Sequence, residues 1–514
     1  MDTYPILVIS LIAILMPATC WALEEKMGLE LEWVFNTSAQ FHGMSFGAGH
    51  QGCITVWDID GDNINEVLFG TRRGDSKRLW CLEGDGSFQW VYPPISEDGL
   101  PGDPTSKVSI IDVNRDGIYE LCFAGRGGRL HILNPDGSVM WTWDEPMEQA
   151  MHGAPQAYDV DGDGYLELFL ADNAGYVHCL TYDGDLIWIS PEGPGSNLGH
   201  VTICDLDQDG KLDILWANNK RRVFCADAQT GEEKWHFDTY STMKYQPVIV
   251  ADINKDGEYE AIIWTDTPGE LICLNWYGEE IWKWALPRPG SIRNCQVMGD
   301  VDADGSIDMV IMGLDAGFCV DIGGEQPETK WEVNFSRWSE EGLLPLGATA
   351  NHWSSYQLVA DIDADEEQEI LWLAPFPIVT DGSTGELEAY YTNEYIALNR
   401  RSENGGWWGD VDGDGVSEWI VDMNGYSHPQ TQVYCLTMGG SFPARSPWPE
   451  YYHAALPAEN QQEQEWLTLK AAGSNSVWFP ITQIKNWFTT TLLLIIPTAG
   501  STLGGRKRRP RRIG

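Results

Sequence analysis

Residues 159–167 read Asp-Val-Asp-Gly-Asp-Gly-Tyr-Leu-Glu, and this acidic nonapeptide decides the fold. Side-chain oxygens stand at its positions 1, 3, 5 and 9, and a glycine stands at position 6. The same arrangement occurs eight times along the chain at nearly even spacing. A single copy would be an ordinary turn signal, because Asp and Gly both favour turns. Eight copies in register indicate a repeated structural unit.

Each nonapeptide has the spacing of a calcium loop. Carboxylate and amide oxygens at positions 1, 3, 5 and 9, with the position 7 carbonyl, can surround one point, and Ca²⁺ prefers such hard oxygen ligands. Position 6 must reverse the chain, which a glycine does at no steric cost. Asn63 is tolerable there in a left-handed conformation, but Glu366 is not. We therefore expect the seventh site to be the weakest.

The eight predicted ligand sets define up to eight structural Ca²⁺ sites. They are Asp58, Asp60, Asp62 and Glu66; Asp112, Asn114, Asp116 and Glu120; Asp159, Asp161, Asp163 and Glu167; Asp205, Asp207, Asp209 and Asp213; Asp252, Asn254, Asp256 and Glu260; Asp300, Asp302, Asp304 and Asp308; Asp361, Asp363, Asp365 and Glu369; and Asp410, Asp412, Asp414 and Glu418.

The segments between the nonapeptides predict four short strands per repeat, A to D, with the acidic loop joining A to B. Apolar runs and Asp-Gly turns of this kind are typical of β-hairpins. Strand D carries a tryptophan, and Trp141, Trp188, Trp235 and Trp282 are each 47 residues apart. The predicted fold is all-β, an eight-bladed propeller of four-stranded antiparallel blades with the tryptophans packed between blades.

The chain's own ends are predicted to close the ring. Strand D of the last repeat would span 441–448, where Pro443 and Pro447 interrupt a strand ladder. Residues 31–35, Leu-Glu-Trp-Val-Phe, precede the first repeat and have the pattern of a spare strand D. We expect this N-terminal strand to complete the eighth blade.

The flanking segments predict export and a membrane anchor. Residues 1–22 contain an apolar run over 6–16 followed by small residues, as in a signal peptide, although no basic residue precedes the run. Residues 31–450 form the propeller, and 451–486 a stalk or small cap. Residues 487–503 are predicted to span the membrane, with the basic tail 504–514 inside and the body at the cell surface. The alternative for this end is a disordered tail.

The net charge of −45 is largely a property of the predicted metal loops. They supply 30 of the 77 acidic residues, and eight Ca²⁺ ions would leave about −29. Such a charge excludes nucleic acid as a natural partner, because its phosphates would be repelled.

These repeats resemble the FG-GAP and VCBS repeat family, the calcium-loop propellers that include the integrin α-chain headpiece. The resemblance covers roughly residues 31–448. It implies a binding or adhesion module whose calcium loops lie on the face opposite the ligand. Integrins have seven blades and fewer calcium loops, so nothing about integrin partners transfers.

A weaker resemblance connects residues 226–235, Ala-Asp-Ala-Gln-Thr-Gly-Glu-Glu-Lys-Trp, to the tryptophan-docking motif of quinoprotein dehydrogenases. That motif packs blades together, and the adjacent cysteine pair of many alcohol-oxidising members is absent from this sequence. A quinoprotein-like enzyme is thus the least favoured reading. A polysaccharide lyase is the main alternative to a binding module, since some rhamnogalacturonan lyases are eight-bladed calcium propellers, but no catalytic residues can be assigned.

Most basic residues of the ring fall in the B-C and D-A connections, on the face opposite the acidic loops. Arginine forks match carboxylates and sulfates, so an acidic glycan, or a protein, is the predicted ligand of this face. Alternatively, acidic neighbours such as Asp144 neutralise the arginines pairwise. The sixteen residues are Arg72, Arg73, Lys77, Arg78, Lys107, Arg126, Arg129, Lys220, Arg221, Arg222, Lys244, Arg288, Arg293, Arg337, Arg400 and Arg401.

The sequence leads to predictions for three further groups of residues: aromatic residues, histidines and cysteines. Four aromatic residues are candidates for stacking on sugar rings: Trp353, Tyr356, Trp407 and Trp408. Five histidines could line a funnel and serve as metal ligands or as a base: His42, His50, His152, His200 and His352. The alternative for these histidines is ordinary polar packing. The strand C cysteines Cys81, Cys179, Cys225, Cys273, Cys319 and Cys435 are expected to be small buried side chains, too far apart for disulfides.

Overall fold

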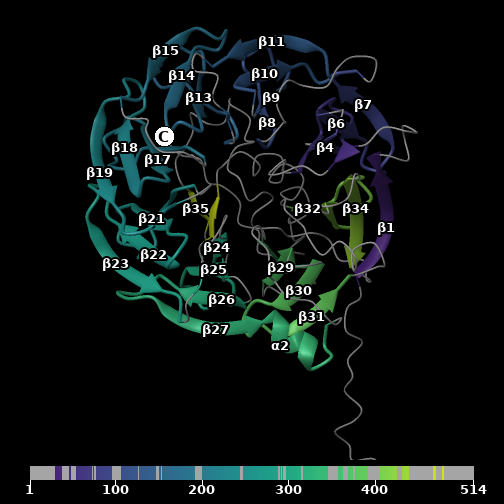
Figure 1. Ribbon diagram of the computed structural model, residues 1–514, viewed down its shortest axis with the longest axis vertical. Helices are drawn as coiled ribbons and strands as arrows, with labels where there is room; N and C mark the ends of the chain where they lie inside the picture. Colours follow the sequence, from purple (N-terminus) through teal and green to yellow (C-terminus); the bar gives the residue numbers. More distant parts are fainter. Residues whose placement is uncertain are drawn as a thin grey trace, which may run out of the picture.

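Eight four-stranded antiparallel sheets follow one another around a ring in the computed structural model (Figure 1). The structure describes residues 29–37, 46–47, 54–71, 73–74, 77–94, 106–125, 127–145, 150–151, 153–191, 200–243, 247–287, 290, 292, 297–313, 316–344, 357–362, 368–373, 377–391, 406–424, 431–438, 467–469 and 477–479. The predicted all-β, eight-bladed propeller is confirmed.

Blades 1 to 4 each take four consecutive segments of the chain. Blade 1 consists of β3 (Thr55–Trp57), β4 (Glu66–Thr71), β6 (Arg78–Leu82) and β7 (Phe88–Tyr92), and blade 2 of β8 (Ser109–Ile111), β9 (Glu120–Gly125), β10 (Arg129–Leu133) and β11 (Val139–Asp144). Blade 3 consists of β12 (Gln156–Tyr158), β13 (Glu167–Ala171), β14 (Val177–Leu180) and β15 (Leu186–Ile189), and blade 4 of β16 (Thr202–Cys204), β17 (Asp213–Asn218), β18 (Arg222–Asp227) and β19 (Glu233–Asp238).

Blades 5 to 8 continue the ring. Blade 5 consists of β20 (Ile249–Ala251), β21 (Glu260–Trp264), β22 (Glu270–Leu274) and β23 (Glu280–Ala285), and blade 6 of β24 (Val297–Gly299), β25 (Asp308–Met312), β26 (Ala316–Asp321) and β27 (Glu328–Asn334). Blade 7 consists of β28 (Gln357–Ala360), β29 (Glu369–Leu373), β30 (Pro377–Asp381) and β31 (Leu387–Tyr390), and blade 8 of β32 (Gly406–Gly409), β33 (Glu418–Asn424), β34 (Thr431–Met438) and β1 (Leu29–Asn36).

The N-terminal strand closes the eighth blade, as predicted. Strand β1 pairs antiparallel with β34, so that Phe35 faces Val433 and Leu29 faces Met438. In Figure 1 the purple start of the ring lies beside its green end. Blade 8 therefore joins strands about 400 residues apart in the sequence, and this strand pairing holds the two ends of the ring together.

Burial follows the strand order within each blade. The B strands are buried throughout, as in β4 and β9, whereas the D strands alternate between exposed and partly buried residues, as in β11 and β19. Inner strands lie between two neighbouring blades and need apolar residues on both faces, while outer strands meet solvent on one side. The apolar B strands and alternating D strands of the sequence are thus explained.

The strand D tryptophans pack between blades, as predicted. A Cβ placed on Gly278, in the C-D turn of blade 5, would lie 2.6 Å from the ring of Trp235 in blade 4. The Nε1 of that tryptophan donates a hydrogen bond to the carbonyl oxygen of Trp276, at 2.9 Å. Trp33 of β1 makes the same contact with the C-D turn of blade 1, donating to Gly84 at 3.0 Å. One tryptophan thus locks each of these blades to the next.

The remaining elements are few. The insertion after blade 6 begins with helix α2 (Phe335–Glu340), capped by the side chain of Asn334. Short pairs join β2 (Phe46–Gly47) with β5 (Arg73–Gly74), and β35 (Leu467–Leu469) with β36 (Val477–Phe479) in the predicted stalk. Over the described ranges, no helix is long and apolar enough to span a membrane. The predicted signal peptide and the anchor at 487–503 lie outside these ranges.

The eight cysteines that the structure describes are free and buried. They include the six predicted strand C cysteines, together with Cys122 and Cys204. Burial raises the pKa of these thiols, by desolvation first and by nearby carboxylates second, as for Cys225 near Asp213. The prediction of small buried side chains is confirmed for this set.

Candidate metal centres

The acidic loops lie where strand A passes into strand B, and their backbone is shaped for reversal at position 6. The residue there has a left-handed conformation in the seven loops where it is described. Its N–H donates to the position 1 carboxylate in each, for example from Gly164 to Asp159 at 2.9 Å. Asn63 adopts φ 72° and makes the same bond to Asp58, so the predicted tolerance of asparagine is confirmed. Residues 363–367 of the seventh loop, with Glu366, lie outside the described residues.

Position 9 is held from the other side of the loop. One carboxylate oxygen accepts a hydrogen bond from the backbone N–H of position 2, as from Ile59 to Glu66 at 2.8 Å and from Val411 to Glu418 at 2.8 Å. The second oxygen is left for another partner. In blade 1 this oxygen, Oε1 of Glu66, is buried and makes no hydrogen bond. A buried, unpaired carboxylate oxygen is costly, and a cation is a suitable partner for it.

The side-chain oxygens of one loop converge on a small volume. In blade 1 one oxygen each from Asp58, Asp60 and Asp62 lies within 4.8 Å of the others, and in blade 3 the same holds for Asp159, Asp161 and Glu167. Three carboxylates this close together repel one another unless a cation lies between them. The donor set is all oxygen, which fits Ca²⁺ rather than Zn²⁺.

The pKa values of the position 9 carboxyl groups reflect the same crowding of acidic groups. Burial raises the pKa of Glu66 to about 8, and the neighbouring carboxylates of Asp60, Glu83 and Asp58 raise it further. Glu418 behaves in the same way, with a pKa raised to about 8 by burial and by nearby acids. The corresponding pKa values of Glu120, Glu167 and Glu260 rise to about 7, with burial as the first cause. A bound divalent cation would oppose both causes and favour the ionised carboxylates.

Sequence reasoning missed a second left-handed residue, at position 4. This position has positive φ at Gly61, Arg115, Gly162, Gln208, Lys255, Ala303 and Gly413. Where it is arginine, glutamine or lysine, its side chain reaches the loop of the next blade. The Nε2 of Gln208 donates to the carbonyl of Gly257 at 2.6 Å, Lys255 donates to the carbonyl of Gly305, and Arg115 lies 3.7 Å from the Asp159 carboxylate. The loops of blades 2 and 3, of blades 4 and 5, and of blades 5 and 6 are thus linked. The glycines at position 4 of the loops in blades 1, 3 and 8 were the sequence signal for the left-handed backbone.

On the opposite face, several predicted ligand-binding arginines already have protein partners. Arg129 pairs with Asp144 at 2.5 Å and Arg222 with Asp238 at 2.7 Å. Arg78 is buried and donates to the carbonyls of Pro93 and Pro94. Pairwise neutralisation, the alternative reading, is therefore confirmed for Arg129 and Arg222. Arg337 likewise pairs with Glu341, at 2.7 Å.

The β17–β18 turn of that face is different. Lys220 and Arg221 are exposed there, and within the described part of the chain neither side chain has an ion pair. Seven further basic residues predicted for this face lie outside the described residues: Arg72, Arg126, Lys244, Arg288, Arg293, Arg400 and Arg401.

The structure tests part of the predictions made for aromatic residues and histidines. The prediction that Trp407 and Trp408 stack on sugars is wrong, because both lie on β32 inside the core, with 7% and 2% of their surface exposed. An innermost strand between two blades leaves a tryptophan no solvent-facing side. His200 is buried, and its Nδ1 accepts a hydrogen bond from the N–H of Ala154, which is ordinary polar packing. The other proposed funnel histidines, with Trp353 and Tyr356, lie outside the described residues.

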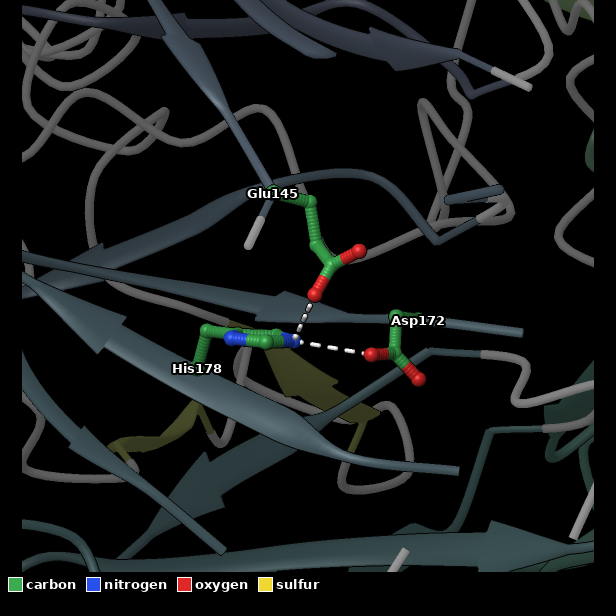
Figure 2. Close-up of side chains that lie close together, drawn as sticks. All are labelled: Glu145, Asp172 and His178. Atoms are coloured by element: carbon green, nitrogen blue, oxygen red, sulfur yellow. Dashed lines mark hydrogen bonds and ion pairs between the residues drawn. The ribbon is translucent and has the colours of Figure 1, made fainter. Parts of the chain in front are cut away.

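A buried histidine that the sequence did not single out joins blades 2 and 3 (Figure 2). The Nε2 of His178, on β14, lies 2.9 Å from Oδ2 of Asp172 and 3.9 Å from Oε1 of Glu145. The other oxygen of Asp172 accepts hydrogen bonds from the N–H groups of Ala174, Gly175 and Tyr176. An imidazole and two carboxylates can bind a transition metal. Here, however, both oxygens of Asp172 already accept or share hydrogen bonds, one with the backbone of the turn and the other with the imidazole. This arrangement indicates a structural contact between blades 2 and 3.

Comparisons with known proteins agree with this architecture. Residues 159–216 match the family model described as FG-GAP-like repeat. This stretch contains the third and fourth acidic loops. No curated protein matches the chain by sequence.

Among solved structures, the Vibrio cholerae biofilm matrix protein Bap1 has a TM-score of 0.61 at 14% identity, over 83% of this chain and 94% of that one. A quinohemoprotein alcohol dehydrogenase from Comamonas testosteroni has a TM-score of 0.53 at 12% identity, over 81% and 78%. Sqt1 of Saccharomyces cerevisiae reaches 0.52 at 10% identity, over 76% and 97%. At such identities these likenesses show the fold alone. The chain is thus an eight-bladed β-propeller, and its residues 159–216 match the FG-GAP-like repeat.

Proposed function

We propose that the chain is an exported, calcium-binding β-propeller that acts as a binding module, with calcium in a structural role. The observation that carries the proposal is the acidic loop of blade 1. Its three aspartates converge, and the buried Oε1 of Glu66 has no hydrogen-bond partner. A hard divalent cation satisfies that oxygen and offsets the repulsion among the carboxylates.

Calcium at these loops would contribute a large share of the stability. A site with a Kd of ~0.1 mM in ~1 mM calcium adds ~1.4 kcal/mol, since the ion binds the folded chain only. Eight independent sites would add on the order of 11 kcal/mol, comparable to the net stability of a whole domain. The ring should therefore depend on calcium.

Calcium binding is tested by counting ions bound to the full-length chain and by melting it in 1 mM calcium and in chelator. We expect several bound ions and a melting temperature lower by roughly ten degrees in chelator. A chain that binds no calcium, and whose midpoint is unchanged by chelator, would refute the proposal. Magnesium at the same concentration is the control for simple charge screening.

The ligand we propose is an acidic glycan, bound on the face of the B-C and D-A connections. Lys220 and Arg221 support this choice, because they are exposed cations on a strongly acidic protein and form no ion pair with any residue that the structure describes. Carboxylates and sulfates on a sugar chain would pair with them.

A glycan array, read with and without calcium, tests the ligand class. The variant Lys220→Gln with Arg221→Asn should weaken binding of acidic glycans about tenfold, whereas Lys211→Gln on the calcium-loop face should not. Asparagine suits residue 221 because φ is 71° there. Binding of neutral glycans alone would contradict the acidic ligand, and release of unsaturated sugar products would favour a lyase instead.

The location we propose is the cell surface, with the segment 487–503 as anchor. Its support is the sequence of the two ends, and the similar fold of Bap1, which is named a biofilm matrix protein, is compatible with a place outside the cell. Protease treatment of intact cells tests it. The ring should be cut from the surface, and deletion of residues 487–514 should release it into the medium.

A further inference from the structure

Every blade carries a β-bulge in strand D, just before the position that packs on the next blade. The register shifts at this point in all eight C-D strand pairs, so one residue of strand D is left out of the ladder. A bulge of this kind re-aims a side chain. From blade 1 to blade 8 the extra residue is Gln89, Met140, Ile187, Lys234, Ile281, Lys330, Glu388 and Glu32.

The two lysines in this series coincide with a change in the acidic loop. Blades 4 and 6 end their loops with aspartate at position 9, namely Asp213 and Asp308, and the other six loops end with glutamate. A lysine on the bulge and a side chain shorter by one methylene at position 9 thus occur together, twice.

The geometry shows why they go together. In blade 6 the Nζ of Lys330 lies 2.8 Å from both carboxylate oxygens of Asp302, 3.0 Å from Oδ2 of Asp304 and 3.0 Å from Oδ1 of Asp308. In blade 4 the Nζ of Lys234 lies 2.9 Å from Oδ2 of Asp207 and 2.6 Å from Oδ1 of Asp213. Both ammonium groups therefore contact positions 3 and 9 of their loop, and Lys330 contacts position 5 as well. These positions are three of the four predicted to supply side-chain ligands to a metal.

An ammonium is a compact cation with three donors, so it can be surrounded by oxygens much as a metal ion is. A Ca²⁺ ion beside it would need the same oxygens and would be repelled by the ammonium. Two buried oxygens of the blade 6 loop, Oδ1 of Asp300 and Oδ1 of Asp308, accept no hydrogen bond. The second forms an ion pair with Lys330, and the charge of Lys330 also acts on the Asp300 carboxylate. The shorter aspartate at position 9 leaves the space that the lysine head group takes.

We propose that blades 4 and 6 carry a built-in cation, the ammonium of Lys234 or Lys330, in place of calcium, and that only the other loops bind the ion. This inference rests on the proposed calcium-binding function. It divides the ring into loops that need calcium and two loops that hold their shape without it.

The test converts one kind of loop into the other. Lys330→Met with Asp308→Glu gives blade 6 the residues that blade 2 has at Met140 and Glu120. The full-length variant should bind one more calcium ion than the wild type, counted by native mass spectrometry or equilibrium dialysis. Lys234→Met with Asp213→Glu should add another. The matched control is Lys283→Met, because Lys283 lies on strand D of blade 5 but pairs with Glu270, outside the loop; its ion count should not change.

The reverse variant covers the case in which the first does not fold. Ile187→Lys with Glu167→Asp in blade 3 should lose one bound ion while the circular dichroism spectrum stays that of the wild type. A wild type that binds more than six ions, or an unchanged count in a folded conversion variant, would overturn the inference and leave calcium binding intact. A wild type that binds none refutes the proposed function, and with it this assignment.

Discussion

Blades 3 and 6 solve one electrostatic problem in two ways. Both gather loop carboxylates within 4.8 Å, Asp159, Asp161 and Glu167 in one case and Asp300, Asp302 and Asp304 in the other. Blade 6 adds Lys330, whose ammonium contacts three of its aspartates, whereas blade 3 has Ile187 at the equivalent bulge. The comparison teaches that the acidic nonapeptide alone does not define a metal site. In the assignment that we propose, a residue some twenty positions away in strand D determines whether the loop holds an ammonium group or binds calcium.

The largest expected effect comes from removing calcium, and it should be uneven around the ring. Six loops at ~1.4 kcal/mol each would lose about 8 kcal/mol in chelator. Hydrogen exchange should therefore speed up strongly at the loops of blades 1, 2, 3, 5 and 8, less at the loop of blade 7, which is expected to be the weakest site, and least at those of blades 4 and 6. Equal loss of protection from exchange in all blades would contradict the proposed difference between the loops. Some loss in blades 4 and 6 is expected, because hydrogen bonds such as that from Gln208 to Gly257 link them to neighbouring loops.

Removing the lysine without changing the loop should have the next largest effect. Lys330→Met leaves Asp302, Asp304 and the buried Asp308 without their cation, which should cost roughly 3 kcal/mol in chelator. Calcium at 1 mM should recover part of that loss, because the vacated loop now has room for the ion. Urea unfolding in both conditions measures it.

The control is Lys283→Met, which loses a partly exposed pair with Glu270 and should cost less than about 1 kcal/mol in either condition. Burial lowers the pKa of Lys330, but hydrogen bonds to Asp302, Asp304 and Asp308 outweigh it, so the net shift is upward. The ammonium is therefore charged throughout the neutral range. A Lys330→Met variant as stable as the control would mean that the ion pair does not support the loop.

Much of this architecture could be predicted from sequence, because it repeats. The period of 47 residues, the Asp-Gly turns and the prolines at 443 and 447 were sufficient for eight blades and for closure by β1. The loop ligands were equally visible, since they lie within nine consecutive residues. The lysines were not, because their approach to the loop depends on a β-bulge, and a bulge displaces a side chain without an obvious sequence signal. The fate of Trp407 and Trp408 was missed for a related reason: strand A is short, and nothing in its composition shows that both of its faces are buried.

A substitution in blade 5 compares the metal loop with the tryptophan contact. Gly278→Ala, in the C-D turn, would place a Cβ 2.6 Å from the Trp235 ring, at φ 85°. Gly257→Ala, at position 6 of the acidic loop, has a similar φ of 91° but no atom within 4 Å of the new Cβ. The second should cost ~1 kcal/mol from backbone strain alone, and the first ~2–3 kcal/mol because overpacking adds to it. Equal losses of stability in thermal unfolding would show that the Trp235 ring shifts to accommodate the new methyl group at no cost.

The smallest expected effect concerns the links between loops, at position 4 of blade 4. Gln208 has φ 56° and donates a hydrogen bond to Gly257 in the loop of blade 5. Gln208→Ala keeps the strained backbone and loses the bond, so it should destabilise the ring by ~1 kcal/mol. Gln208→Gly loses the same bond but relieves the strain, so the two terms should nearly cancel. Chemical denaturation in calcium compares the two variants. If alanine and glycine are equally destabilising, the left-handed backbone at position 4 carries no strain, and the linking side chain alone determines what that position contributes.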